Sequence, residues 1–357
     1  MIKILLIEDA ESDIKTVENA VERMNDEDSS LEIELTVADN FENAIKSLNN
    51  SFHGAIVDIR LSTKEEENGN IIIDKIMKEF RIPIAVMTGT PDTKLDPNSP
   101  IKIYKKGEHL YKDIIKSLIS MKQTGLFDVI GGKGIIEKTI DKIFWNNLYP
   151  QISSWEELYK KGIDTEKALM RYTVSCLQEL LDEDTLSYVT EEMYIKPPIT
   201  SNIKTGSIVQ EKKSGQYMVV LSPPCDLALH NGMFKTDRIL LCEIDNNDDI
   251  NKKVIGTITK NSKQVSALKL AINNQYTTYY HWLPENLLFK GGYINFRKVL
   301  TYTPEEILEF FNTPELKIQE YFVKNILSRF SSYYARQGQP DFDIDNEAEK
   351  IVQELCN

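Results

Sequence analysis

The stretch Ile2–Asp13, IKILLIEDAESD, decides the fold of the N-terminal region because it joins a short apolar run to a group of acids. Five of its first seven residues are apolar, which is typical of a buried strand. Two adjacent carboxylates, Glu8 and Asp9, follow at the point where a loop should lead into a helix. They are either the solvated start of that helix or half of a site.

Short apolar strands and amphipathic helices alternate over residues 1–123. Residues 10–24, directly after the first strand, have apolar residues at helical spacing. Further strands are predicted at residues 31–39, 54–59, 82–89 and 101–104, and further helices at residues 40–50, 70–80 and 109–123. The alternation is typical of βαβ crossovers. It predicts an α/β fold with a doubly wound, parallel five-stranded sheet that has helices on both faces.

Carboxylate, hydroxyl and ammonium side chains are found at the carboxyl ends of these strands. Ligands of such sheets bind beyond the carboxyl ends of the strands. The residues found there are Glu8, Asp9, Asp58, Thr88, Gly89, Lys105 and Lys106. Three converging carboxylates repel one another unless a cation lies among them, and Mg²⁺ prefers oxygen ligands. With a hydroxyl and an ammonium group nearby, the set suits phosphoryl transfer to a free carboxylate.

Four stretches, LLIEDAESD, AIVDIRLS with a later NG, VMTGT and IYKKG, resemble the receiver domain of two-component response regulators. The resemblance covers about residues 1–123 and implies the CheY-like, flavodoxin-like fold. It implies that Asp58 accepts a phosphoryl group from the phosphohistidine of a sensor histidine kinase. Thr88 would close on that group and Lys106 would pair with it, with Lys105 left open as the alternative lysine.

The same resemblance implies Mg²⁺ as the cofactor and assigns its ligands. Asp9 would bind the ion directly and Glu8 through water. Asp58 and the backbone carbonyl of Arg60 would be the remaining ligands that the protein supplies.

The sequence departs from the family pattern at several places. The family places a helix between Thr88 and the lysine pair. Here the segment at that place, residues 91–100, PDTKLDPNSP, is short and contains three prolines, so we expect the fourth helix to be lost or reduced. The aromatic switch position, three residues before Lys106, is Ile103, with Tyr104 one place off. Ser62 stands where the family often has proline, and the acidic insert TKEEENGN follows it. We therefore expect phosphorylation without signalling through the family's usual output face.

From residue 124 onward the pattern changes. Residues 124–194 are predicted to form a helical linker region, and residues 303–357 to form C-terminal helices in 303–312, 314–338 and 344–356. Residues 195–302 are predicted to be β-rich, an α+β domain with a small antiparallel sheet or barrel. Its predicted strands include a hairpin within 206–226 and the segments 237–244, 253–260, 276–283 and 291–303.

The motif VVLSPPCDLALHNG, residues 219–232, is the most pointed feature of the C-terminal half. Cys225 could be a nucleophile with His230, a metal ligand with His230 and Cys242, or a buried residue of a structural turn. No activating partner is identifiable, so we identify no catalytic site beyond a receiver that catalyses its own phosphorylation. The "PCDL" turn and the later SSYYARQGQPDF resemble uncharacterised domains attached to receivers in bacterial defence loci, which implies an antiphage two-component system.

Composition restricts the partners. The formal charge is −13, and residues 1–120 hold 23 acids and 15 bases, which argues against nucleic-acid binding. No segment has the length of an apolar membrane span and no secretory pattern is present, so we expect a cytoplasmic protein without a membrane partner. The four cysteines form no CxxC pair and predict no disulfide framework.

Two function classes follow. In the first, the chain is a phospho-acceptor that signals or buffers phosphate between a sensor histidine kinase and a second response regulator or effector protein. In the second, the β-rich half is an enzyme or nucleic-acid processor that phosphorylation switches on. Replacing Cys225, Asp226 and His230 separates the two classes.

Overall fold

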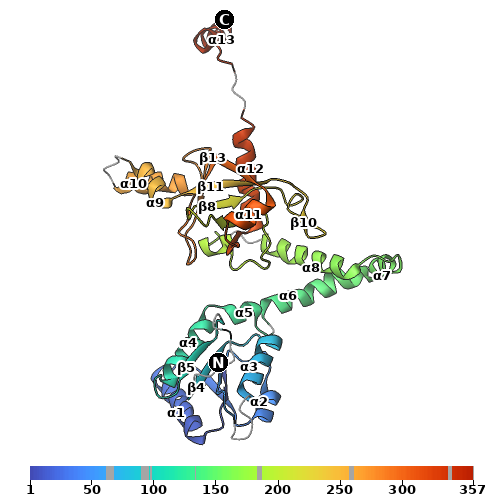
Figure 1. Cartoon of the computed structure of the whole chain (residues 1–357), viewed down its shortest axis with the longest axis vertical. Coiled ribbons are helices and arrows are strands. Elements are labelled where there is room, and N and C mark those ends of the chain that lie inside the picture. Colours follow the sequence, from blue (N-terminus) through green and yellow to red (C-terminus); the bar gives the residue numbers. More distant parts are fainter. Residues whose placement is uncertain are drawn as a thin grey trace. The chain divides into compact units, whose positions relative to one another are not determined.

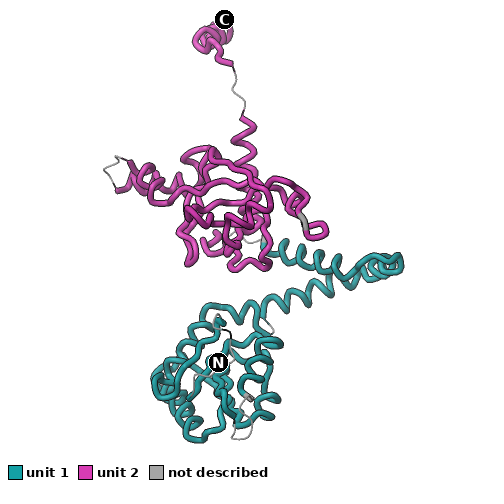
Figure 2. Tube along the Cα trace, viewed as in Figure 1, with its two compact units in different colours: residues 1–185 teal, residues 186–357 magenta. Residues whose placement is uncertain are grey.

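Two compact units make up the chain, residues 1–185 and residues 186–357 (Figure 2). The computed structural model describes residues 1–61, 68–89, 96, 99–132, 134–182, 187–256, 261–336 and 340–356. The finer bounds predicted above, at 123/124, 194/195 and 302/303, stay predictions.

Unit 1 begins with a five-stranded parallel sheet, as the sequence predicts. Its strands are β1 (Ile2–Ile7), β2 (Ile33–Ala38), β3 (Gly54–Val57), β4 (Ile84–Thr88) and β5 (Lys102–Lys105). The strand order is β2-β1-β3-β4-β5 and every pairing is parallel. This is the order of the flavodoxin-like doubly wound fold, which brings the carboxyl ends of β1 and β3 together.

Helices cover both faces of this sheet (Figure 1). They are α1 (Glu11–Glu27), α2 (Phe41–Ser47), α3 (Asn68–Glu79) and α4 (Tyr111–Gln123). Successive side chains of a strand point to opposite faces. Ile4 and Leu6 of β1 therefore join the apolar cluster under α1 and α4, and Leu5 and Ile7 join the cluster under α2 and α3. The doubly wound prediction is confirmed.

Part of the predicted departure from the family pattern lies outside the described residues. Of residues 91–100, where we expect the fourth helix to be lost or reduced, residues 91–95, 97 and 98 are not described. Ser62 and residues 63–67 of the acidic insert are likewise outside.

Unit 1 continues into a helical hairpin, which we define as residues 135–182. After the short α5 (Leu126–Ile130) come α6 (Ile135–Ile143), the π-helical η1 (Phe144–Leu148), the 3₁₀ turn η2 (Tyr149–Gln151), α7 (Ile152–Lys160) and α8 (Thr165–Asp182). Gly162 has a φ of +76°, which glycine adopts without steric cost, and the chain reverses there. Helix α8 then returns in contact with α6 and α7 (Figure 1).

Unit 2 is built on a seven-stranded antiparallel sheet in the order β12-β13-β11-β8-β7-β14-β6. The strands are β6 (Tyr194–Ile195), β7 (Ser207–Gln210), β8 (Tyr217–Val220), β11 (Ile239–Asp245), β12 (Tyr280–Leu283), β13 (Gly292–Tyr302) and β14 (Leu316–Ile318). A separate small ladder joins β9 (Leu229–His230) to β10 (Met233–Phe234). Within the described ranges β12 and β6 do not pair with each other, so the sheet is open and the barrel alternative does not hold.

Six helical segments complete unit 2: η3 (Thr190–Met193), α9 (Asn247–Ile255), α10 (Asn261–Ile272), α11 (Pro304–Phe310), α12 (Glu320–Tyr334) and α13 (Ile344–Cys356). They are the segments found in the described part of the unit. Among the residues that the structure describes, no helix combines the length and apolar character that crossing a membrane requires.

Two predictions for unit 2 are wrong over the residues that the structure describes. Residues 253–255 of the strand predicted at 253–260 form the last turn of α9, a helix that starts where the side chain of Asn246 accepts hydrogen bonds from the amides of Asp248 and Asp249. Residues 257–260 of that predicted strand lie outside the described residues. Leu316–Ile318, predicted as helix, is strand β14, which pairs with β7 and with β6. One element of the predicted C-terminal helical region thus belongs to the sheet.

A buried histidine should make the stability of unit 2 depend on pH. His281 of β12 is 4% exposed, and burial, aided by the charge of Arg329, lowers its pKa to about 3. The histidine pKa in the unfolded chain is near 6.5. Between that value and about pH 3, His281 binds a proton in the unfolded chain but not in the folded chain. The free energy of unfolding should therefore fall by about 1.4 kcal/mol per pH unit as the pH drops from about 6 toward 3.

The measurement is urea unfolding at pH 7 and pH 5 for the wild type and for His281→Gln. The wild type should lose about 2 kcal/mol more than the variant between the two values. An equal loss in both proteins would show that His281 is not the group responsible.

Candidate phosphoryl-acceptor site

The ladder bonds of the parallel sheet extend one residue beyond three strands and fix the site residues. The amide of Asp58 donates to the carbonyl of Ile7 at 2.9 Å, and the amide of Glu8 donates to Ala38 at 3.2 Å. On the other side the amide of Lys106 donates to the carbonyl of Thr88 at 2.9 Å. The acids and the lysine thus start from anchored backbone at one edge of the sheet.

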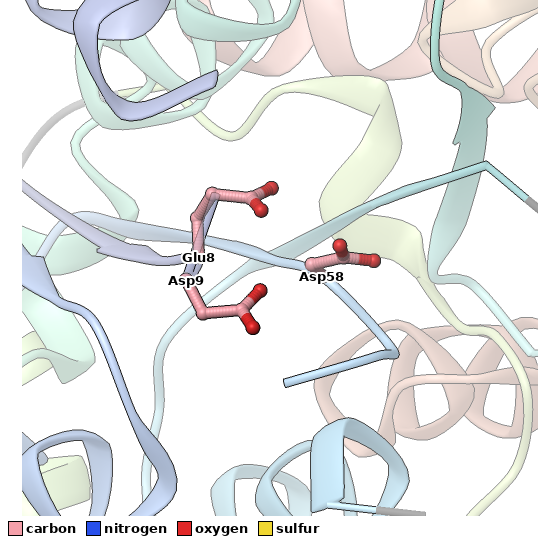
Figure 3. Close-up of side chains that lie close together, drawn as sticks. All are labelled: Glu8, Asp9 and Asp58. Carbon is pink, nitrogen blue, oxygen red and sulfur yellow. The ribbon is translucent and has the colours of Figure 1, made fainter. Parts of the chain in front are cut away.

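The three predicted acids do come together. Carboxylate oxygens of Glu8, Asp9 and Asp58 lie within 4.8 Å of one another. Figure 3 shows the carboxyl groups of Glu8 and Asp9, from one segment, turned toward the same space as that of Asp58. Glu8 is 2% exposed and Asp58 is 7% exposed, whereas Asp9 is exposed to solvent.

Lys106 is the lysine that reaches the acids. Its ammonium group donates to Asp58 Oδ2 at 2.8 Å, to Glu8 Oε2 at 2.6 Å and to Asp13 Oδ2 at 2.7 Å. Lys105 points elsewhere and forms an exposed pair with Glu108 at 2.5 Å. Of the two lysines left open by the sequence, Lys106 is thus the one whose ammonium group contacts Asp58.

Asp13 is the site residue that sequence reasoning missed. It lies in the first turn of α1, where an acidic side chain usually serves only to stabilise the helix by interacting with the positive end of its dipole. The available signal was its position in the sequence, because Asp13 lies six residues after the end of β1 and four residues after Asp9.

The electrostatics of the site favour an additional cation. Burial raises the pKa of Glu8, and the charge of Asp58 adds to that effect. Burial alone would lower the pKa of Lys106, but its hydrogen bonds to Asp13, Asp58 and Glu8 outweigh this and raise the pKa. Lys106 stays protonated, so a single ammonium group faces four carboxylates including Asp9. An oxygen donor set with excess negative charge fits a hard divalent cation such as Mg²⁺.

The backbone that follows β3, residues 58–60, lies close to the start of α3. The amide of Arg60 donates to Asp58 Oδ1 at 3.3 Å. The amide of Gly69 in α3 donates to the carbonyl of Ile59 at 3.1 Å. A Cβ atom at Gly69 would lie 2.4 Å from the Asp58 carbonyl oxygen. The backbone of α3 therefore lies too close to the backbone of Asp58 for any residue but glycine at this position, the second of the quoted "NG".

Thr88 is buried at the end of β4, and the two residues considered for the aromatic switch position, Ile103 and Tyr104, lie inside β5. Thr88, the last residue of β4, is 1% exposed. Ile103 is 43% exposed, whereas Tyr104 packs against the cluster under α1 and α4 and meets the ring of His109 edge-on at 5.4 Å.

The residues singled out in the C-terminal half do not assemble into a comparable site. Cys225 is exposed and its sulfur lies 3.5 Å from Asp226 Oδ1, and His230 is exposed in β9. Cys242 is fully buried in the sheet core, where burial raises the pKa of its thiol to about 12. Within the described ranges, the group of three acids around Asp58 is the one set of ligands close enough to share a metal ion.

Solved structures similar to this chain match its N-terminal third. A CheY-like receiver domain from Methylobacillus flagellatus has 12% identity and a TM-score of 0.28, covering 34% of this chain and 98% of its own. A two-component response regulator from Clostridium difficile has 20% identity and a TM-score of 0.27, covering 34% and 97%. A response regulator of Thermotoga maritima, in complex with Mg²⁺ and BeF, has 20% identity and a TM-score of 0.25, covering 34% and 99%.

No protein-family model and no curated protein matches the sequence. The likenesses to solved structures concern the fold alone.

Proposed function

We propose that the chain is a response regulator whose Asp58 accepts a phosphoryl group from a sensor histidine kinase. The observation that carries the proposal is the convergence of Glu8, Asp9, Asp13 and Lys106 on a nearly buried Asp58. In the transfer, an Asp58 carboxylate oxygen forms a bond to phosphorus while the bond from phosphorus to the imidazole nitrogen breaks. The product is an aspartyl phosphate and a free histidine on the kinase.

The residues around Asp58 have separate roles in this proposal. Asp9, Asp58 and the Arg60 carbonyl would hold Mg²⁺ directly and Glu8 through water. When bound, the ion neutralises charge on the phosphoryl oxygens. Lys106, held protonated by its carboxylate partners, would exchange one of them for a phosphoryl oxygen. Thr88 would donate its hydroxyl to another oxygen of the group.

Beryllofluoride, a mimic of the phosphoryl group, tests this binding role without a kinase. In the presence of Mg²⁺ it should raise the melting temperature of unit 1, because a ligand that binds only the folded state stabilises it. Asp58→Asn should abolish the increase. An increase of equal size in the variant, or none in the wild type, would contradict the proposal.

The setting of this activity is also part of the proposal. It includes a cytoplasmic location, delivery of phosphate to or from a second response regulator or effector protein, and a role in defence against phage. The last of these rests only on the resemblance of the C-terminal half.

The motif residues of the C-terminal half should be dispensable for phosphoryl uptake. Because Cys225, Asp226 and His230 belong to unit 2, Cys225→Ala, Asp226→Ala and His230→Ala should each take up phosphate from acetyl phosphate at the wild-type rate. A rate reduced tenfold in any of the three would contradict the proposal that phosphoryl uptake depends on the residues around Asp58 alone. In the alternative function, phosphorylation switches on an enzyme or nucleic-acid processor in the C-terminal half, and these three variants would lose that output while they keep uptake.

A further inference from the structure

We propose that unit 2 contains a binding site for a small molecule that has an apolar body and one anionic group. The site is a pocket of about 570 Å³ beside α12, within the size range of pockets for drug-sized ligands. Its apolar lining comprises Ile203, Pro224, Leu227, Ala228, Leu229, Val323 and Leu327. Its polar lining comprises Asn202, Lys204, Thr205, Lys317, Glu320 and Lys324.

The motif left unexplained by the proposed function forms one wall of this pocket. The amides of Asp226 and Leu227 both donate to the carbonyl of Pro223, at 3.1 and 3.3 Å, and this closes a tight turn. The turn buries Leu227 to 6% exposure while it leaves Cys225 exposed. The sequence "PPCDLAL" therefore supplies the apolar surface of one pocket wall, and this role does not require Cys225 to act as a nucleophile.

The charges around the pocket select an anion. Lys324 is paired with Glu320 at 3.0 Å, but Lys204 and Lys317 have no acidic partner among the described residues. These two lysines also line a neighbouring hollow of about 70 Å³, together with Thr200 and Ser207. In a chain with a net charge of −13, two unpaired ammonium groups at one pocket are a local site for a carboxylate or phosphate.

Calorimetric titration of the full chain with octanoate and with 1-octanol tests the site. The two probes share an apolar tail and differ in charge. Octanoate should bind more tightly to the wild type, and the double variant Lys204→Met/Lys317→Met should weaken octanoate about tenfold while it leaves 1-octanol within twofold. Leu229→Ser, at a 43% exposed position, should weaken both probes.

Lys253→Met, at an exposed position in α9, is the matched control and should change neither affinity. Three results would overturn the proposal. They are no binding of octanoate, equal binding of the two probes by the wild type, and an equal effect of the control and the double variant.

A second and independent observation concerns the helical hairpin. Within it, Ile143 is the one buried apolar side chain among the described residues. The large apolar side chains that it exposes are Ile135, Ile136, Ile140, Phe144, Trp145, Tyr149, Ile152, Tyr159, Ile163, Met170, Val174, Leu180 and Leu181. Helices in proteins are stabilised mainly by packing of an apolar face, so this hairpin lacks most of the contacts it needs.

We infer that a second copy of this chain covers the hairpin, with the two hairpins forming a four-helix bundle. On α8 the residues Met170, Val174, Leu177 and Leu181 repeat with the spacing of a coiled-coil seam, which favours a helical partner. The exposed apolar area is on the order of 1,000 Å², close to what each partner contributes to a stable interface. Residues 135–182 carry a net charge of only −2, so two copies can meet here with little repulsion.

Sedimentation equilibrium of the full chain tests this inference. The wild type should be a dimer at micromolar concentration, and Met170→Glu/Leu181→Glu should shift it to a monomer. Both positions are more than 60% exposed within one copy, so the changes spare the fold. Leu308→Glu, at a 76% exposed position in α11, is the control and should remain a dimer. A monomeric wild type, or a double variant that still dimerises, would contradict the inference.

Discussion

Lys106→Met should reduce the free energy of unfolding of unit 1 by about 3–5 kcal/mol when divalent ions are absent. The side chain of Lys106 is 22% exposed and bonds three carboxylates, two of which are nearly buried. Methionine keeps the length and the apolar stem but removes the charge, so Glu8, Asp13 and Asp58 would repel one another at close range. Urea unfolding at pH 7 in the presence of a chelator measures the effect.

Mg²⁺ should restore much of the lost stability and should stabilise the variant more than the wild type, because the variant presents one more uncompensated negative charge. Lys105→Met is the matched control. Its lysine precedes Lys106 but pairs with Glu108 at the surface, so the change should stay within about 0.5 kcal/mol. If both variants lose the same stability, the three-way bonding of Lys106 is not what holds the site together.

Asp9→Asn should lower the rate of Mg²⁺-dependent phosphoryl uptake on the order of 100-fold. Changes in the residues that merely orient metal ligands cost 10–100-fold in affinity or activity, and loss of a carboxylate ligand should cost at least as much. Asp9 is exposed, so the variant should fold normally. The rate is measured with acetyl phosphate over a range of Mg²⁺ concentrations, where the variant should need much more Mg²⁺.

Asp39→Asn is the control for this change. Asp39 directly follows β2 at the same edge of the sheet, but its carboxylate accepts hydrogen bonds from Asn40 and Asn43 and is not part of the acidic group. Its uptake rate and Mg²⁺ requirement should match those of the wild type. A defect of similar size in both variants would mean that the negative edge as a whole attracts Mg²⁺, without a defined ligand set.

The sheet of unit 1 and most of its site could be predicted from sequence because both follow from local patterns. Apolar runs of four to six residues between amphipathic helices imply parallel strands, and parallel strands bring their following residues to one edge. That reasoning put Glu8, Asp9, Asp58 and Thr88 at strand ends, where the structure has them, and the roles of these residues stay predictions. It left Lys105 and Lys106 open, because the backbone turns directly after β5 and the strand alternation no longer tells which side chain points inward.

The remainder depends on contacts that the sequence does not encode locally. Asp13 gains its role only when Lys106, 93 residues away, reaches it. Residues 316–318 form a strand because β7 and β6 offer edges on both sides, although the flanking residues favour a helix. The pocket of unit 2 joins segments that are more than 90 residues apart, so no short motif could reveal it.

The most direct test of the central claim is intact-mass measurement of the full chain after incubation with acetyl phosphate and Mg²⁺, for the wild type and for Asp58→Asn. The account predicts that the wild type gains the mass of one phosphoryl group, that hydroxylamine removes it as expected for an acyl phosphate, and that chelation of Mg²⁺ prevents it. Asp58→Asn should gain nothing. A wild type that remains unmodified at saturating Mg²⁺, or an Asp58→Asn variant that is modified equally well, would contradict the assignment of Asp58 as the phosphoryl acceptor.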